Sequence, residues 1–207
     1  MKGSWTRLLT LAAGSVLLLA GGNGFPSFAF PAAAGGLAAL DLAGTTRVGE
    51  RPEPNAVVWL EAGTPPRPGT RKAVLDQRNL TFSPHVLAVS IGTVVEFPNR
   101  DRVFHNVFSF RDGKRFDLGM YPVGAVKRVT FGEPGLSRIF CNIHPNMAAY
   151  VMAVDSGFSA VSDSSGRFVL AAVPPGTYTY HAWRPGGETL TGSISVDGDK
   201  SMEIRWP

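Results

Sequence analysis

The sequence predicts an all-β protein made of two β-sandwiches. Short runs rich in β-branched and aromatic residues alternate with turn residues at intervals of about 8–12 residues, which is typical of sandwich strands. The chain of 207 residues contains 24 glycines and 16 prolines, a turn-rich composition that argues against a helical bundle. No segment after residue 30 has the apolar period of a helix. This length allows two small domains with cores of their own.

Residues 1–29 predict a secretory signal peptide. Lys2 and Arg7 precede a mostly apolar run at residues 8–20, and Ser27 and Ala29 have the spacing that a signal peptidase recognises. The alternative is an uncleaved anchor, but the apolar run is short for spanning a bilayer. We expect a periplasmic or secreted protein without an integral membrane span. Residues 30–54 begin with alanines and glycines and are expected to form a flexible leader.

The first strand expected after this leader is at residues 55–62 (NAVVWLEA), where an apolar run precedes a Pro- and Gly-rich loop at 63–69. The last strand alternates, because Met202, Ile204 and Trp206 share one face and the polar residues between them share the other. We expect the remaining strands at residues 72–77, 86–89, 93–97, 106–110, 125–131, 137–141, 149–154, 167–170, 177–183 and 191–196.

Charge and cysteine content exclude several function classes. The formal net charge is +4 without a basic stripe, so nucleic acid is not expected as a partner. The single cysteine, Cys141, excludes an internal disulfide and an iron–sulfur site with four cysteines. A lone thiol in an exported protein is usually oxidised, paired between chains or protected by a metal. Cys141 is therefore a candidate metal ligand.

Residues 141–147 (CNIHPNM) contain the most informative motif of the chain. Cys141, His144 and Met147 place a thiol, an imidazole and a thioether in one loop, and soft sulfur and nitrogen donors favour copper. His105 can supply a second imidazole from a separate segment. Two histidines and one cysteine with a weak axial methionine form a type 1, or blue, copper site.

Other methionines and histidines are weaker candidates. Met120 lies in a predicted loop next to Gly119 and stays open as an alternative axial donor. Met152 lies in an apolar strand and is assigned to the core. His181 falls on the polar face of its strand and is expected to be solvated. The role of His85 is left open between a surface residue and a second metal or regulatory site.

A series of motifs surrounds this constellation: FSP at 82–84, LAV at 87–89, GTVVEF at 92–97, Asn99, Asp101, HNV at 105–107, Gly135, and C-x2-H-x2-M at 141–147. In this order they resemble the cupredoxins, and within them the plastocyanin- and amicyanin-like blue copper proteins. The short C-x2-H-P-x-M loop is most similar to that of the amicyanin-like members. The resemblance implies a Greek-key β-sandwich and a copper domain at residues 70–155.

This resemblance implies one type 1 copper ion held by His105, Cys141, His144 and Met147. It also implies that Asn106 ties the two ligand-bearing loops together, since such outer hydrogen bonds hold ligand geometry. The implied function is that of a one-electron carrier rather than an enzyme, with a cytochrome or a dehydrogenase as redox partner. The alternative is a copper-handling protein that delivers or buffers the metal without redox turnover.

A second group of motifs lies in the last third of the chain. D-x2-G-R-F at residues 163–168 is followed by VPPGTY at 173–178, and together they resemble the carboxypeptidase-regulatory-like, transthyretin-type sandwich. The resemblance implies a second small β-sandwich at residues 156–207. That module opens with an Ala-Val-Val strand, which residues 55–62 fit. Residues 55–69 therefore either belong to this module, with the copper domain inserted in it, or add an edge strand to the copper domain.

Overall fold

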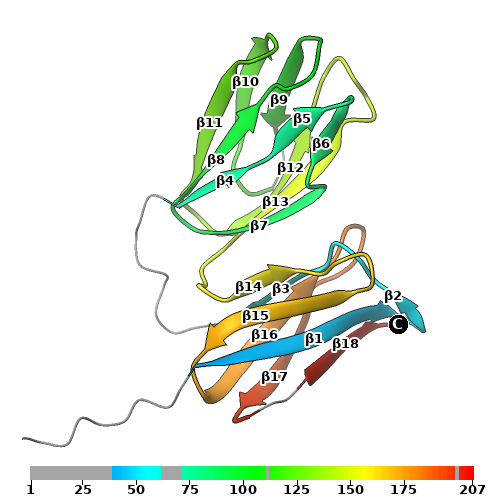
Figure 1. Ribbon diagram of the computed structural model, residues 1–207, viewed down its shortest axis with the longest axis vertical. Coiled ribbons are helices and arrows are strands. Elements are labelled where there is room, and N and C mark those ends of the chain that lie inside the picture. Colours follow the sequence, from blue (N-terminus) through cyan, green and yellow to red (C-terminus); the bar gives the residue numbers. More distant parts are fainter. Residues whose placement is uncertain (1–38, 62–70, 111, 199–200) are drawn as a thin grey trace, which may run out of the picture. The chain divides into compact units, whose positions relative to one another are not determined.

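The computed structural model describes residues 39–61, 71–110, 112–198 and 201–207, and every regular element in these ranges is a β-strand (Figure 1). The predicted all-β class is confirmed. Within the same ranges, no helix has the length and apolarity needed to cross a membrane. The predicted signal peptide at residues 1–29 and residues 30–38 of the predicted leader lie outside the described residues.

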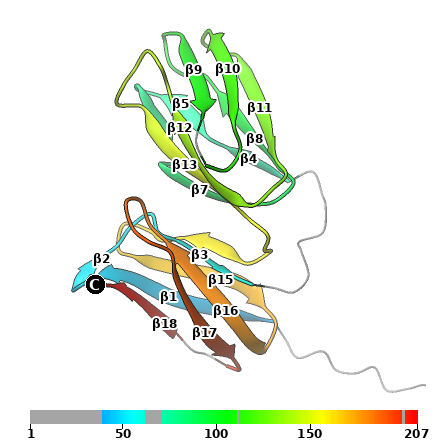
Figure 2. The ribbon, with the colours of Figure 1, turned by 180° about the vertical axis from the view of Figure 1, so that it is seen from behind.

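The segment that carries the predicted copper site forms two sheets and a hairpin (Figures 1 and 2). The five-stranded sheet has the order β10 (Phe116–Tyr121), β9 (His105–Ser109), β12 (Gly135–Phe140), β13 (Ala148–Val154) and β7 (Val86–Ser90). The three-stranded sheet has the order β11 (Val126–Phe131), β8 (Thr93–Pro98) and β4 (Lys72–Val74). The hairpin consists of β5 (Asp76–Arg78) and β6 (Thr81–Ser83). Paired strands are antiparallel except for β13 with β7 and β4 with β8.

The core of this sandwich forms because side chains alternate between inward and outward positions along each strand. On β8, Val95 and Phe97 are fully buried, and both pack in one cluster with Ile139 of β12. The same cluster contains Cys141 and Met147. The packed core therefore extends to two of the four predicted copper ligands.

The second sandwich combines strands from both ends of the described chain (Figure 1). One sheet has the order β15 (Arg167–Val173), β1 (Leu40–Val48) and β18 (Ser201–Trp206), with β2 (Arg51–Pro52) also paired to β1. The other has the order β14 (Ser159–Val161), β3 (Val57–Leu60), β16 (Gly176–Trp183) and β17 (Leu190–Val196). The predicted alternation of the last strand is present, since Met202, Ile204 and Trp206 are buried and the residues between them are exposed.

The flexible leader predicted for residues 30–54 is wrong from Leu40 onward, because β1 is the central strand of a sheet. Gly44 and Thr46 occupy inward positions on this strand. The side chains of Phe168 and Met202 pack directly onto the bare backbone of Gly44. The buried Thr46 hydroxyl lies within 3.0 Å of two backbone carbonyl oxygens. A glycine and a threonine thus replace the apolar residues that would have predicted a strand.

β3 belongs to the second sandwich, where it pairs antiparallel with β14 and β16. Trp59 of β3 lies opposite Ser159 of β14 on one side and His181 of β16 on the other. The chain therefore leaves this sandwich after β3, forms β4 to β13, and returns to it at β14. Of the two arrangements left open for residues 55–62, the structure has the insertion.

Candidate metal centre

One predicted ligand lies on strand β9, and the other three lie in the loop that joins β12 to β13. His105 is the first residue of β9, and Cys141 directly follows β12. These strands are neighbours in the five-stranded sheet. The loop that holds His144 and Met147 is closed by two backbone hydrogen bonds: the Cys141 N–H donates to the Met147 carbonyl at 3.3 Å, and the Met147 N–H donates to the His144 carbonyl at 2.9 Å.

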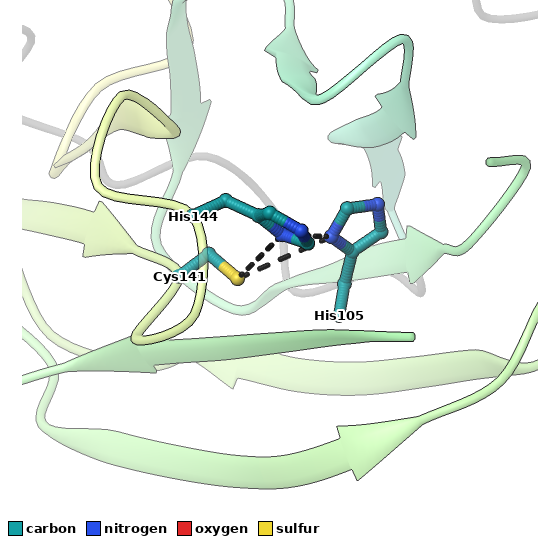
Figure 3. Close-up of side chains that lie close together, drawn as sticks. All are labelled: His105, Cys141 and His144. Atoms are coloured by element: carbon teal, nitrogen blue, oxygen red, sulfur yellow. Dashed lines mark hydrogen bonds between the residues drawn. The ribbon is translucent and has the colours of Figure 1, made fainter. Parts of the chain in front are cut away.

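The side chains of His105, Cys141 and His144 point toward one another (Figure 3). The two histidine Nδ1 atoms lie 3.1 Å apart, and Cys141 Sγ lies 4.0 Å from Nδ1 of His105 and 3.6 Å from Nδ1 of His144. His105 is 0% exposed, Cys141 is 4% exposed and His144 is half-buried. A thiol sulfur and two imidazole nitrogens form a donor set that suits copper, so the residues present fit this metal.

The three methionines that are candidates for the axial donor differ in their exposure and in the core cluster to which they belong. Met147 is 1% exposed and belongs to the same core cluster as Cys141. Met120 is 47% exposed. Met152 is buried in a different cluster, where it packs with Val86. The structure therefore keeps Met147 as the axial candidate and gives Met120 no buried position beside Cys141.

His105 has a carboxylate partner on the side of the ring that faces away from the cluster. Its Nε2 atom lies 3.1 Å from Oδ2 of Asp101. The backbone N–H groups of Leu80 and Arg102 donate to the same carboxylate at 2.7 and 2.9 Å. These bonds, above all that from Leu80, hold the pKa of Asp101 below its ordinary value, although burial opposes the shift. The sequence does not predict this contact by its motifs; its one signal is a carboxylate four residues before a candidate histidine ligand.

Asn106 lies beside His105 on β9 with a buried side chain. Its Nδ2 donates to Oδ1 of Asp117 on β10 at 2.7 Å, and its Oδ1 has no hydrogen-bond partner among the residues that the structure describes. The tie between the two ligand-bearing loops that the resemblance implies for Asn106 stays a prediction.

The two remaining histidines lie outside the cluster. His85 is exposed, and its Nδ1 lies 3.1 Å from the carbonyl oxygen of Ala148. His181 is half-buried, with Nε2 at 2.7 Å from Oε1 of Glu61 and its ring stacked on Trp59 at a centroid distance of 5.1 Å. The solvation expected for His181 is partial, since its side chain is 19% exposed and its ring contacts Trp59 and Glu61.

Comparison with known proteins returns both families that the motifs resemble. Residues 144–205 match the family model of the carboxypeptidase regulatory-like domain. Solved structures similar to this chain include a purple cupredoxin, amicyanin and a copper-containing nitrite reductase. No curated protein matches the sequence.

Three solved structures illustrate the similarity. The purple cupredoxin from Nitrosopumilus maritimus is 26% identical, with 40% of this chain and 99% of that chain covered and a TM-score of 0.37. A reduced mutant of amicyanin is 21% identical to this chain and has a TM-score of 0.38. The match covers 47% of this chain and 98% of amicyanin. The copper-containing nitrite reductase from Thermus scotoductus SA-01 is 24% identical to this chain and has a TM-score of 0.39. The match covers 44% of this chain and 25% of that enzyme, so this chain spans a quarter of it.

Proposed function

We propose that this protein holds one copper ion in a type 1 site and acts as a one-electron carrier. The observation that supports the proposal is the convergence of Cys141 Sγ with the Nδ1 atoms of His105 and His144, all within 4.8 Å of one another. Met147, buried in the adjoining core, would be the axial ligand. Copper in such a donor set accepts and releases a single electron.

The chain's contribution is to hold the donors in place in both oxidation states. His105 and Cys141 are fixed by adjacent strands, and Cys141 and Met147 are packed in the core that the two sheets enclose. The hydrogen bonds within the loop from Cys141 to Met147 limit the movement of His144. Burial of the thiol also keeps water and oxidants away from its sulfur. A donor set that does not rearrange favours fast electron transfer.

Electron exchange with a partner is proposed to occur through His144. Of the three clustered residues, His105 and Cys141 are almost fully buried, whereas His144 is half-buried. Ile143 beside it is 47% exposed and offers apolar contact area. The partner would be a redox protein, either a cytochrome or a dehydrogenase. The proposal places both proteins in the periplasm or outside the cell, on the basis of the signal peptide predicted at residues 1–29.

The test is to load the purified metal-free chain with Cu(II) and to measure copper content, visible absorption and electrochemistry. We expect one copper ion per chain, the intense visible band of a Cu(II)–thiolate bond, and reversible reduction. Cys141→Ser should lose the band and keep the fold, because a hydroxyl cannot supply the thiolate charge transfer. His85→Gln, which changes a histidine outside the cluster, is the matched control and should keep the band.

Two results would contradict this function. A colourless copper complex would show that the cluster is not a type 1 site. A coloured complex that cannot be reduced and reoxidised reversibly would instead favour copper delivery or buffering.

A further inference from the structure

Each ring nitrogen of His105 has a different neighbour. Nδ1 lies 3.1 Å from Nδ1 of His144 and faces the cluster (Figure 3). Nε2 lies 3.1 Å from Oδ2 of Asp101, in a pair whose side chains are 0% and 14% exposed. The ring is thus held between the candidate metal centre and a largely buried carboxylate.

Backbone donors determine where this carboxylate lies. The N–H of Leu80 donates to Oδ2 of Asp101, and the N–H of Arg102 donates to Oδ1. The backbone N–H of Asp101 donates in turn to Oδ1 of Asn99 at 3.0 Å, and the Asn99 amide donates to two backbone carbonyls. Asp101 is therefore held by the turn of the β5–β6 hairpin, through Leu80, and by its own loop, in addition to its contact with the histidine.

His144 has no equivalent support. Its Nδ1 contacts His105 and Cys141, and among the residues that the structure describes, none is hydrogen-bonded to its Nε2. The two histidines of the cluster are therefore held differently. His105 is buried and accepts support from a carboxylate, whereas His144 is half-buried and its Nε2 has no such partner within the described part of the chain.

We propose that Asp101 is a positioning residue of the metal centre that also lowers its reduction potential. By accepting a hydrogen bond from the Nε2–H of His105, it leaves the lone pair of the neutral ring on Nδ1, directed at the cluster. Its negative charge favours the more highly charged metal ion, Cu(II), over Cu(I). This inference rests on the proposed copper function.

Two physical arguments support this role. Outer carboxylates of this kind fix the tautomer of a ligand histidine and raise its basicity. Charges that are shielded from water also interact strongly, so a carboxylate one ring away from the metal affects the redox equilibrium. If Asp101 served only to hold its loop together, hydrogen bonds would be enough. The neutral amide of an asparagine can make most of the same bonds. The charge of Asp101 is therefore the property that the test must isolate.

The first measurement needs no metal. In 15N-labelled, metal-free protein held above the ordinary pKa of histidine, about 6.5, NMR of the imidazole nitrogens shows which of them carries the proton. We expect His105 to be protonated at Nε2 in the parent chain and to lose this single preference in Asp101→Ala. Protonation of His105 at Nδ1 in the parent chain would overturn the proposal.

The second measurement compares reduction potentials of copper-loaded variants at one pH. Asp101→Asn retains an acceptor oxygen and removes the charge, so we expect a higher potential with the visible band retained. Asp101→Ala also removes the hydrogen bond, and we expect its copper affinity to fall by about 10–100-fold, as is typical when the outer partner of a ligand is lost. Glu96→Gln is the control, because it removes one carboxylate that pairs with Arg128 in the same sandwich.

The outcomes separate this inference from the proposed function. Equal potentials for Asp101→Asn and Glu96→Gln, in a parent chain that has the visible band, would overturn the inference and leave the copper function intact. If the parent chain takes up no copper, the proposed function fails. In that case the protonation of His105 in the metal-free chain decides alone whether Asp101 positions this ring.

Discussion

The backbone N–H of Cys141 donates to the carbonyl oxygen of Met147 at 3.3 Å, so the loop that carries three of the four proposed ligands begins and ends on one hydrogen bond. This bond places the methionine beside the cysteine at the edge of the core, where Met147 is 1% exposed. If the proposed copper site forms, a short loop closed in this way would keep the Met147 sulfur near the metal without a strong bond of its own.

Met147→Leu should keep the visible band and raise the reduction potential. The band arises from the thiolate, whereas the thioether stabilises Cu(II) weakly from the axial direction. Voltammetry of the copper-loaded variant measures the change. Met120→Leu alters an exposed methionine and should leave the potential unchanged. A shift in the Met120 variant alone would make Met120 the axial donor.

Gly44→Ala should lower the free energy of unfolding by about 1–3 kcal/mol, as overpacking of a core does. A Cβ atom at residue 44 would meet Phe168 Cε1 at 2.7 Å and Met202 Cγ at 2.8 Å. Denaturant titration followed by fluorescence measures the loss. Gly132→Ala is the matched control, since a Cβ there has no atom within 4 Å. Equal stability of the two variants would show that β1 does not pack as described.

Leu60→Ala should destabilise the second sandwich by about 2–5 kcal/mol, the range for a large-to-small change in a core. Leu60 is fully buried on β3, which pairs with β14 and β16. Hydrogen exchange should show faster exchange in those three strands while β9, β12 and the copper band are preserved. Ile139→Ala, in the other core, should give the converse pattern. Loss of protection in β9 upon the Leu60 change would contradict the strand assignment.

Asp163→Asn should destabilise the protein at neutral pH and by less in acid. The hydroxyl of Ser165 and the backbone N–H of Arg167 lower the pKa of Asp163 from 3.8 to about 2. Because the folded pKa is the lower one, the ionised carboxylate contributes stability above about pH 3.8, and this contribution is lost as the pH falls through about 2. Unfolding measured across this range should show the parent and the variant converging.

A matched variant tests the cause. Ser165→Ala removes the first of these donors and should show a smaller convergence of the same sign. A difference between Asp163→Asn and the parent that stays constant from pH 7 to pH 2 would argue against the carboxylate as its source.

The sequence predicts those features of the site that come from residues close together along the chain. Cys141, His144 and Met147 lie in one loop, and their donor types alone indicated copper. His105 comes from a separate segment; the need for a second imidazole singled it out, and the family resemblance implied the same ligand role. Asp101 went unassigned because its contact with His105 depends on the fold of the loop between β8 and β9.

Two of the strands that the sequence does not predict, β1 and β10, have specific physical reasons. The sequence predicts a leader in place of β1 because Gly44 and Thr46, and not large apolar residues, occupy buried positions on this strand. β10 was not predicted because its register with β9 shifts between Asp117 and Met120, where Gly119 has a φ of 64°. Such a bulge interrupts the two-residue period by which a strand is recognised.

The insertion of β4 to β13 between β3 and β14 determines the order in which the protein can be assembled during synthesis. The N–H of Ala56 donates to the hydroxyl of Ser162, 106 residues later in the chain. When β1 and β3 leave the ribosome, only the short β2 among their pairing partners has been synthesised. One partner of β1 is the final strand, β18, so β1 cannot complete its pairing until synthesis ends. The intervening strands pair among themselves and need none of these partners. The sandwich that contains the candidate metal centre can therefore be complete while β1 and β3 still have exposed edges. Such edges are sites of aggregation until their partner strands are synthesised.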